Sequence, residues 1–585
     1  MNRCHTLISR KNDGFDMVLI ISCFSDMPGV SGTNESDNSG DSKDAKSSSS
    51  VSVTRGNVKV REYDPRQDLR ALGQWICSNQ DPPKYFENVD YIQSIGVFNQ
   101  LFKPTFNEVE SECMEEYERM KVETKKVLRN FDGQISLSVD VLTDNNDFGQ
   151  CSNNLGQHYS DYLCISAHFI DEKWKLRKWV LYFCTLSVSG QSDDLLKKCE
   201  DRGIFRSLED WGIENKIFTL TMGNDKFCNE VAGYVKRYIQ VQKELRRNSQ
   251  LFRVYCCGDL FREMVQDAFD KIEDIVHKVR RVYTFTTDYP MWFLKMANLQ
   301  EALKLWSIGK LSSKDVIDSH DVPSPEEWNK VEGVCKAVES IHEVSGALFE
   351  PEIQVTANVY LYHLHELREM LTRMSIGSEG FNRSIVEGML GKVDEYWDHM
   401  FLLLAISAAL DPRFKMRYIE FVCSKVEGRD GNSQVPAVLD AIRKQFDEYV
   451  IRFPEKRNRA SYSHSEGQSD PLVRANHTFT VLQDYQQFIQ SNHHPAKISE
   501  LDIYLDQPVL PWSQDFNPLA WWRSAAPKYP TLSRMARDFL AIPVSLSTCG
   551  EAYYTLSRPA DEHMICLKPD LMNALMCARS WAYRR

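Results

Sequence analysis

The chain has 585 residues, 42% of them hydrophobic and 26% charged, which is the balance of an ordinary globular protein. This length indicates several domains, or one large domain with an insertion. The formal net charge of −12 argues against a protein that binds nucleic acid with its whole surface. Any contact with DNA is therefore expected to come from a local basic patch.

The cysteines and the apolar runs indicate the compartment. Sixteen cysteines are scattered without the spacing of a disulfide framework or a zinc site, so we expect free thiols in a reducing compartment. The apolar run from Met17 to Phe24 is far shorter than the roughly 20 residues that a membrane helix needs. The sequence predicts an intracellular protein with no membrane contact and no metal site of its own.

The N-terminal part divides into a polar tail and a helical region. Serine, glycine and acidic residues dominate 30–53, and residues 1–60 are predicted to be disordered. A helical region is expected over 61–130, where one predicted face carries Leu69, Leu72, Trp75 and Ile76. A long amphipathic helix beginning near Phe106 has acids early and lysines late, as the helix dipole favours.

Over 131–250 the period changes from helical to alternating. In "ISLSVDVL" the apolar residues Ile135, Leu137, Val139 and Val141 alternate with Ser136, Ser138 and Asp140, which is typical of a half-buried strand. Two more strands are predicted in "DYLCISAHFI" and "RKWVLYFCTL", joined by a turn short enough for a hairpin. A helix and a fourth strand, "KIFTLTMGN", follow. This order is the beginning of a ribonuclease H-like layout.

The second half is predicted to be mainly helical. Residues 251–425 form an expected helical insertion, 426–475 an expected polar linker, and 476–585 a compact C-terminal region. Two apolar stripes support the helices of the insertion: Val331, Val334, Val338, Ile341 and Leu348, and then Leu361, Leu364, Leu367, Leu371 and Met374.

Several of these segments together resemble the hAT superfamily of DNA transposases, and more closely its plant members of the DAYSLEEPER and RICESLEEPER type. The similar blocks, in order, include "ISLSVDVLTDN", "WGIENKIFTLTMGN", "SPEEWNKVEGVCKAV", "AALDPRFKMRYIEF" and "FNPLAWWRSAAPKYPTLSRMARDFLAIPVS". The last block is the most specific, because such a run of Trp, Pro and Arg at fixed spacing seldom arises by chance. The resemblance implies an α/β (α+β) fold: a ribonuclease H-like mixed sheet, a large all-helical insertion and a C-terminal dimerisation region that completes the core.

Active members of this superfamily cut DNA with two metal ions held by three acids, and the resemblance locates those acids here. Asp140 is retained at the first position, although a solvent-facing acid at a strand end is the alternative. The second position is Gly223, with Asp225 two residues on. At the third, where the family has Ser-Glu-Ser-Ala-Phe, this chain has Gly550 and a displaced Glu551. A one-residue shift on a helix turns a side chain by roughly 100°, so Glu551 replaces the acid only if the preceding turn is altered.

This chain also differs from the family in two further motifs. The Cys-x-x-His pattern of the insertion region retains Cys256 but has Asp259 in place of the histidine. Cys4, His5 and Cys23 do not have the spacing of the BED zinc finger that such proteins commonly carry. With one acid of three in place, we expect Asp140 to be a relic of the catalytic site. We also expect the protein to need no cofactor and to have no enzymatic activity. Mg²⁺ is expected only under the alternative, an active hAT transposase or nuclease.

The resemblance also assigns a dimer contact, either with a second copy or with a related hAT-derived protein. Its predicted residues are Trp521, Trp522, Leu532, Met535, Phe539, Leu540 and Ile542, with packing inside one chain as the alternative. The candidate contacts with nucleic acid are Lys278, Arg280, Arg281, Lys456, Arg457 and Arg459, with solvated helix or loop surfaces as the alternative. The expected function is that of a domesticated nuclear protein that associates with DNA or chromatin and regulates transcription.

Overall fold

The computed structural model describes residues 64–79, 82–89, 102–143, 161–186, 204–243, 251–283, 292–311, 322–349, 355–425, 431–453, 499–513, 515–546, 558–559 and 567–582. The chain divides into two compact units, Met1–Val122 with Cys566–Arg585, and Glu123–Ile565. The predicted disordered segment 1–60 lies outside the described residues.

The first unit contains α2 (Pro65–Ser78), α3 (Pro82–Glu87), most of α5 (Phe106–Asn130) and α21 (Pro569–Ala582). Asp64 caps α2, since its carboxylate accepts a hydrogen bond from the Arg66 N–H at 3.0 Å. The rings of Tyr117 and Trp581 stack with centroids 5.6 Å apart, which joins α5 to α21. The last helix therefore groups with the N-terminal helices, whereas the sequence assigned it to a region 476–585.

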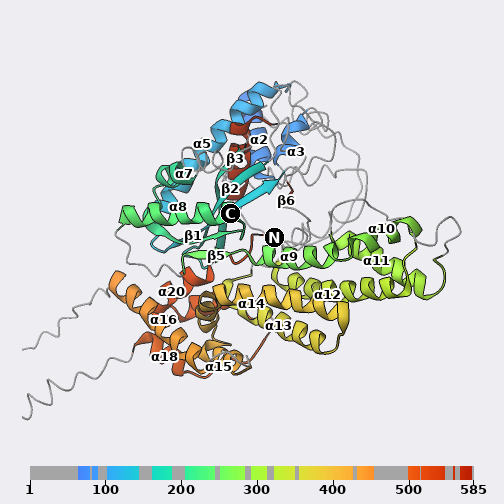
Figure 1. The fold of residues 1–585 in the computed structure, drawn as a ribbon. Coiled ribbons are helices and arrows are strands. Elements are labelled where there is room, and N and C mark those ends of the chain that lie inside the picture. The colour runs from blue at the N-terminus through green and yellow to red at the C-terminus, as the bar shows by residue number, and fades with distance from the viewer. Residues whose placement is uncertain are drawn as a thin grey trace, which may run out of the picture. The chain divides into compact units, whose positions relative to one another are not determined.

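The second unit is built on a six-stranded mixed sheet (Figure 1). Its strands are β1 (Ile135–Thr143), β2 (Asp161–Ile170), β3 (Leu176–Leu186), β4 (Ile217–Met222), β5 (Arg253–Tyr255) and the short β6 (Arg558–Pro559). The order is β3-β2-β1-β4-β5, with β6 also pairing with β1. Strands β1, β2 and β3 are antiparallel neighbours, and β4 lies parallel to both β1 and β5. The predicted mixed sheet is confirmed.

The prediction that β1 is half-buried is wrong. Ser136 and Ser138, on its polar side, are as buried as the apolar residues opposite them. The Ser138 hydroxyl lies 2.8 Å from Nε2 of His168 on β2, and burial lowers the pKa of that histidine well below its usual value. Because β1 is central in the sheet, both of its faces are covered, and its small hydroxyls fit where a solvent-facing strand would carry charge.

Most of the other described elements of the second unit are α-helices. They are α7 (Ile204–Trp211), α8 (Lys226–Lys243), α9 (Cys257–Asp270), α10 (Glu273–Val282), α11 (Trp292–Ser307), α12 (Pro325–Phe349), α13 (Tyr360–Ile376), α14 (Gly380–Ala409), α15 (Lys415–Lys425), α16 (Gly431–Arg452), α18 (Glu500–Asp506), α19 (Pro518–Ala525) and α20 (Pro530–Leu540). The two predicted apolar stripes lie on α12 and α13, and nearly all of their residues are buried. No described helix is long and apolar enough to cross a membrane.

The prediction of a polar linker over 426–475 is wrong for the first part of this range, because α16 (Gly431–Arg452) lies there. Val438, Ile442, Phe446 and Tyr449 recur at steps of four, four and three residues, and all four are buried. Pro436 and the polar start of the segment conceal this stripe, but a proline in the first turns of a helix interrupts few hydrogen bonds. The later part of the segment lies outside the described residues.

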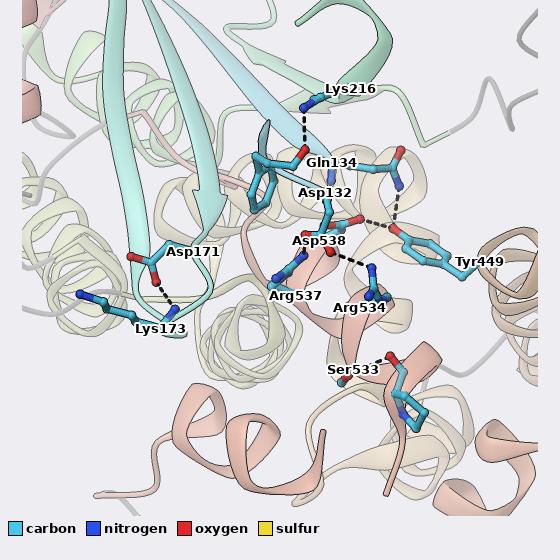
Figure 2. Close-up of polar contacts among 12 residues, drawn as sticks. Asp132, Gln134, Asp171, Lys173, Lys216, Tyr449, Ser533, Arg534, Arg537 and Asp538 are labelled. Atoms are coloured by element: carbon cyan, nitrogen blue, oxygen red, sulfur yellow. Dashed lines mark hydrogen bonds and ion pairs between the residues drawn. The ribbon is translucent and has the colours of Figure 1, made fainter. Parts of the chain in front are cut away.

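A buried polar network ties α16 and α20 to the start of β1 (Figure 2). The Asp538 carboxylate accepts hydrogen bonds from the Gln134 N–H at 3.0 Å and from the Tyr449 hydroxyl at 2.7 Å. The Gln134 amide donates in turn to the Tyr449 oxygen at 2.6 Å. Burial raises the pKa of Asp538 to about 6, even though these hydrogen bonds favour its charged form. Three segments distant in sequence thus meet at one carboxylate.

A second network joins the end of α14 to the C-terminal region through the "DPRFK" turn. Asp411 is fully buried and accepts hydrogen bonds from Asn358 at 2.6 Å and from the Arg413 guanidinium at 2.7 Å. The Lys415 ammonium donates to the Gln507 carbonyl just after α18 at 2.8 Å. The Trp522 indole N–H donates to the Leu410 carbonyl at 2.8 Å. These contacts explain why this turn carries both charges and aromatic partners.

Candidate active site

The carboxyl ends of the parallel strands bring the first two acid positions to one edge of the sheet. Ser138 on β1 pairs with Thr221 on β4, so that two residues further on Asp140 and Gly223 stand at the same level of neighbouring strands. Asp140 is half-buried there. The structure therefore brings these two sequence-predicted positions together.

The segment that leads to the third position reaches the same edge. The Thr221 hydroxyl donates to the Pro543 carbonyl at 2.7 Å, and the Cys257 N–H donates to the Val544 carbonyl at 2.8 Å. The Leu546 N–H lies 3.3 Å from the Cys256 sulfur. Gly550 and Glu551 themselves lie outside the described residues.

At the second position the glycine is closely approached by a carboxylate from another element. A Cβ atom built on Gly223 would lie 2.7 Å from Oδ2 of Asp259 and 3.3 Å from Oδ2 of Asp225. Asp259 sits in the first turn of α9 and forms an ion pair with Arg262 at 2.8 Å. An acid 36 residues along the chain thus occupies the space beside the missing side chain.

Asp225 and Arg253 form hydrogen bonds with backbone groups at the start of α8 and at the end of β4. The Asp225 carboxylate accepts a hydrogen bond from the Cys228 N–H at 2.8 Å, as a residue before the first turn of α8 does. The Arg253 guanidinium donates to the carbonyls of Met222 and Gly223 at the end of β4 and lies over the ring of Tyr255, 4.6 Å from its centroid. A cation therefore already lies against the end of this strand.

Cys256 is a buried thiol, which disfavours the thiolate that a metal ligand or nucleophile requires. Burial raises its pKa to about 11, with the nearby Asp259 acting in the same direction. The thiol therefore stays protonated at neutral pH. Its sulfur contacts the Leu546 N–H and, at 4.0 Å, the Ser545 hydroxyl, which is a structural role.

The described residues do not fit the two-metal centre that the fold family implies. Two divalent ions roughly 4 Å apart need carboxylates that bridge them, and Mg²⁺ requires oxygen ligands in near-octahedral geometry. Of the two acid positions described, only Asp140 is a carboxylate. Across the described part of the chain, no group of three His, Cys, Asp or Glu side chains is placed to hold a metal ion.

Residues of α14 also reach this edge, and sequence analysis missed them. Lys392, Glu395 and His399 line a pocket together with Asn224 and Asp259. The ammonium of Lys392 forms ion pairs with Glu263 at 3.5 Å and Asp267 at 3.1 Å. The spacing of Lys392, Glu395 and His399 along α14 places these three residues on one helical face. Nothing local in the sequence shows which part of the sheet that face contacts.

We predict that Gly223→Ala destabilises the protein by about 1 kcal/mol, because the new methyl group displaces the Asp259 carboxylate from its ion pair with Arg262. The Asp259→Ala background removes the clash, so the same substitution is expected to be nearly neutral there. Urea unfolding of the four chains in a double-mutant cycle measures the coupling. A coupling near zero would contradict the close approach of the two residues.

The predicted dimer residues lie in the interior of the single chain. Trp521 is half-buried, and the other six, Trp522, Leu532, Met535, Phe539, Leu540 and Ile542, are buried. The Phe539 ring packs against Phe218 of β4 with centroids 5.0 Å apart. These side chains form core between α19, α20 and the rest of the unit, which is the alternative that the sequence left open.

The candidate basic residues are only partly described. Lys278 forms an ion pair with Glu327 at 2.6 Å, which links α10 to α12. Arg280 and Arg281 are exposed in the last turn of α10, where cations suit the helix dipole. Lys456, Arg457 and Arg459 lie outside the described residues.

Family models match three parts of the chain. Residues 500–582 match the hAT family C-terminal dimerisation region, and residues 358–449 match the hAT-like transposase, RNase-H fold. Residues 156–251, which contain β2 to β4, match the ZBED1 RNase-like domain.

Similar proteins extend over most of the chain. The zinc finger BED domain-containing protein RICESLEEPER 2 of Oryza sativa subsp. japonica is 28% identical, with 83% of this chain and 70% of that protein aligned. The zinc finger BED domain-containing protein DAYSLEEPER of Arabidopsis thaliana is 28% identical, over 84% of this chain and 70% of its own length. A putative AC transposase of Zea mays is 23% identical, over 90% of this chain and 66% of its own length.

Proposed function

Because this chain belongs to the hAT superfamily of transposase-derived proteins, we propose that it is a catalytically inactive member that acts in the nucleus as a dimer. It associates with DNA or chromatin and regulates transcription. The observation that carries the loss of activity is Gly223, which stands level with Asp140 on the neighbouring strand and has the Asp259 carboxylate beside it. No cofactor is required for this function.

The chemistry explains why one replacement is enough. In a two-metal centre each bridging carboxylate neutralises both ions and fixes their separation. The loss of one acid therefore damages both metal sites together. Asp259 does not restore the centre, because Arg262 neutralises part of its charge.

The alternative is an active metal-dependent transposase or nuclease. It is favoured by the retained Asp140 and by the hydrogen bonds that hold the segment before Glu551 at the same edge of the sheet. Under this alternative Asp140 and Glu551 would hold Mg²⁺. The two functions make opposite predictions for metal binding.

We predict no Asp140-dependent binding of Mg²⁺ or Mn²⁺. Calorimetric titration of the full chain, the Asp140→Ala variant and an Asp274→Ala control is expected to give the same heats for all three. Asp274 is an exposed acid in the first turn of α10 and controls for the loss of surface charge. Binding that disappears only in Asp140→Ala would overturn the proposal, and strand cleavage would then be tested.

The dimer and the nuclear location are supported by the relatives. The match to a dimerisation region supports association with a second copy or with a related hAT-derived protein. The names of two relatives include a BED zinc finger domain, which supports association of this chain with DNA and therefore a nuclear location. The exposed guanidinium groups of Arg280 and Arg281 are the described candidates for a phosphate contact.

A further inference from the structure

Aromatic side chains gather on one face formed by α13, α15 and the segment 507–513. The ring of Trp512 lies 5.2 Å from that of Tyr362 and 5.7 Å from that of Phe414, measured between centroids. Phe414 lies 4.9 Å from Tyr418, which lies 6.1 Å from Phe421. These five residues, Tyr362, Phe414, Tyr418, Phe421 and Trp512, are called the aromatic face below.

The outer rings of the aromatic face are open to solvent. Trp512 is 55% exposed and Phe421 is 48% exposed. Scattered exposed apolar residues are normal, but contiguous patches mark interaction sites. Trp and Tyr are also the residues enriched at the centres of protein interfaces.

The "DPRFK" turn holds the Trp512 end of the aromatic face in place through three contacts. The Arg413 guanidinium lies 4.6 Å from the ring centroid of Trp512 and donates to the Ser513 carbonyl at 3.1 Å. The Leu510 N–H donates to the Pro412 carbonyl at 2.9 Å. A surface held in one arrangement loses little conformational entropy on binding.

We propose that the aromatic face is the surface through which this chain binds a second copy of itself. This inference rests on the dimer in the proposed function and specifies its contact. The residues 500–582 match a dimerisation region, yet the apolar residues of α19 and α20 that the sequence singled out are in the core. Among the described residues of that match, the large apolar side chains that remain exposed are Ile503, Val509 and Trp512.

The charges around the face favour a second copy over nucleic acid. Arg417 and Lys425 on α15 are exposed, and so are Glu366 on α13 and Glu420 on α15. A nucleic acid would require cations to dominate. A two-fold interface places each patch against its own copy, so a rim that carries both signs can pair across it.

The test compares two charge insertions in the full chain. Phe421→Glu places a carboxylate on the aromatic face at a helical position four residues before Lys425, a spacing that favours an ion pair within α15. Ile451→Glu is the matched control, because Ile451 is a 79% exposed apolar residue on α16, outside the face. Light scattering and sedimentation of both variants and the parent chain give mass and dissociation constant.

The expected result is a dimer for the parent chain and for Ile451→Glu, and a dimer weakened about 30-fold or more for Phe421→Glu. A second substitution, Trp512→Ser, is expected to weaken it similarly. A dimer that survives both substitutions would overturn the aromatic face while leaving the proposed dimer intact. A monomeric parent chain would overturn both.

Discussion

Asp411→Ala is expected to destabilise the second unit by about 3–5 kcal/mol, because it leaves a buried guanidinium without its counter-charge. The Asp411 side chain is fully buried and that of Arg413 is 5% exposed, so water does not replace the lost carboxylate. Asn358 and the Arg413 backbone N–H lose their acceptor in the same step.

Urea unfolding followed by tryptophan fluorescence measures this effect, since Trp512 and Trp522 lie beside the turn. Asp411→Asn should cost less, because the amide oxygen still accepts hydrogen bonds. Arg417→Ala, which breaks an exposed pair with Glu420, is the matched control and should change stability by less than about 0.5 kcal/mol. Equal effects of Asp411→Ala and Arg417→Ala would contradict the buried network.

Asp538 is expected to make the protein less stable as the pH rises from about 4 to 6. Its pKa is raised to about 6 in the folded chain, against 3.8 for an ordinary aspartate. In this window the folded chain binds more protons than the unfolded chain, so the free energy of unfolding falls as the pH rises. At about 1.4 kcal/mol for each pKa unit, the full loss is about 3 kcal/mol.

The Asp538→Asn variant isolates this effect, because it keeps the shape and has no charge to titrate. Gln134 can accommodate it by turning its amide over, since Gln134 Oε1 makes no hydrogen bond to any described residue and could accept from Tyr449. The parent chain should lose stability relative to Asp538→Asn between pH 4 and 7, measured by urea unfolding at each pH. Parallel curves would show that the carboxyl group is not perturbed.

The nearby Asp132 acts in the opposite direction and is the same in both chains. Burial raises its pKa, but Arg537 and Arg534 outweigh burial, so that the pKa lies below its usual value. Its contribution to stability is therefore lost as the pH falls. Because Asp132 is present in both chains, most of its contribution cancels in the difference between the parent chain and Asp538→Asn, and the remainder is its coupling to Asp538 through Arg537.

Local periodicity was enough to predict much of the fold. Alternation in "ISLSVDVL" and "DYLCISAHFI" predicted β1 and β2, and the apolar run "RKWVLYFCTL" predicted β3. The apolar steps in α12 and α13 predicted their buried faces. These signals are local, because a strand or helix repeats its buried side every two or about 3.6 residues. The identity of residue 223 as glycine is equally a fact of sequence.

Only the tertiary structure decided what lies against each of these residues. The Asp259 carboxylate reaches Gly223 because α9 begins directly after β5, beside the end of β4. The same folding buried Ser136 and Ser138, turned the expected dimer residues of α20 into core, and left Trp512 exposed. Sequence determines which elements form, because that depends on near neighbours. Which side chains meet depends on contacts between residues tens to hundreds of positions apart, and no local pattern records them.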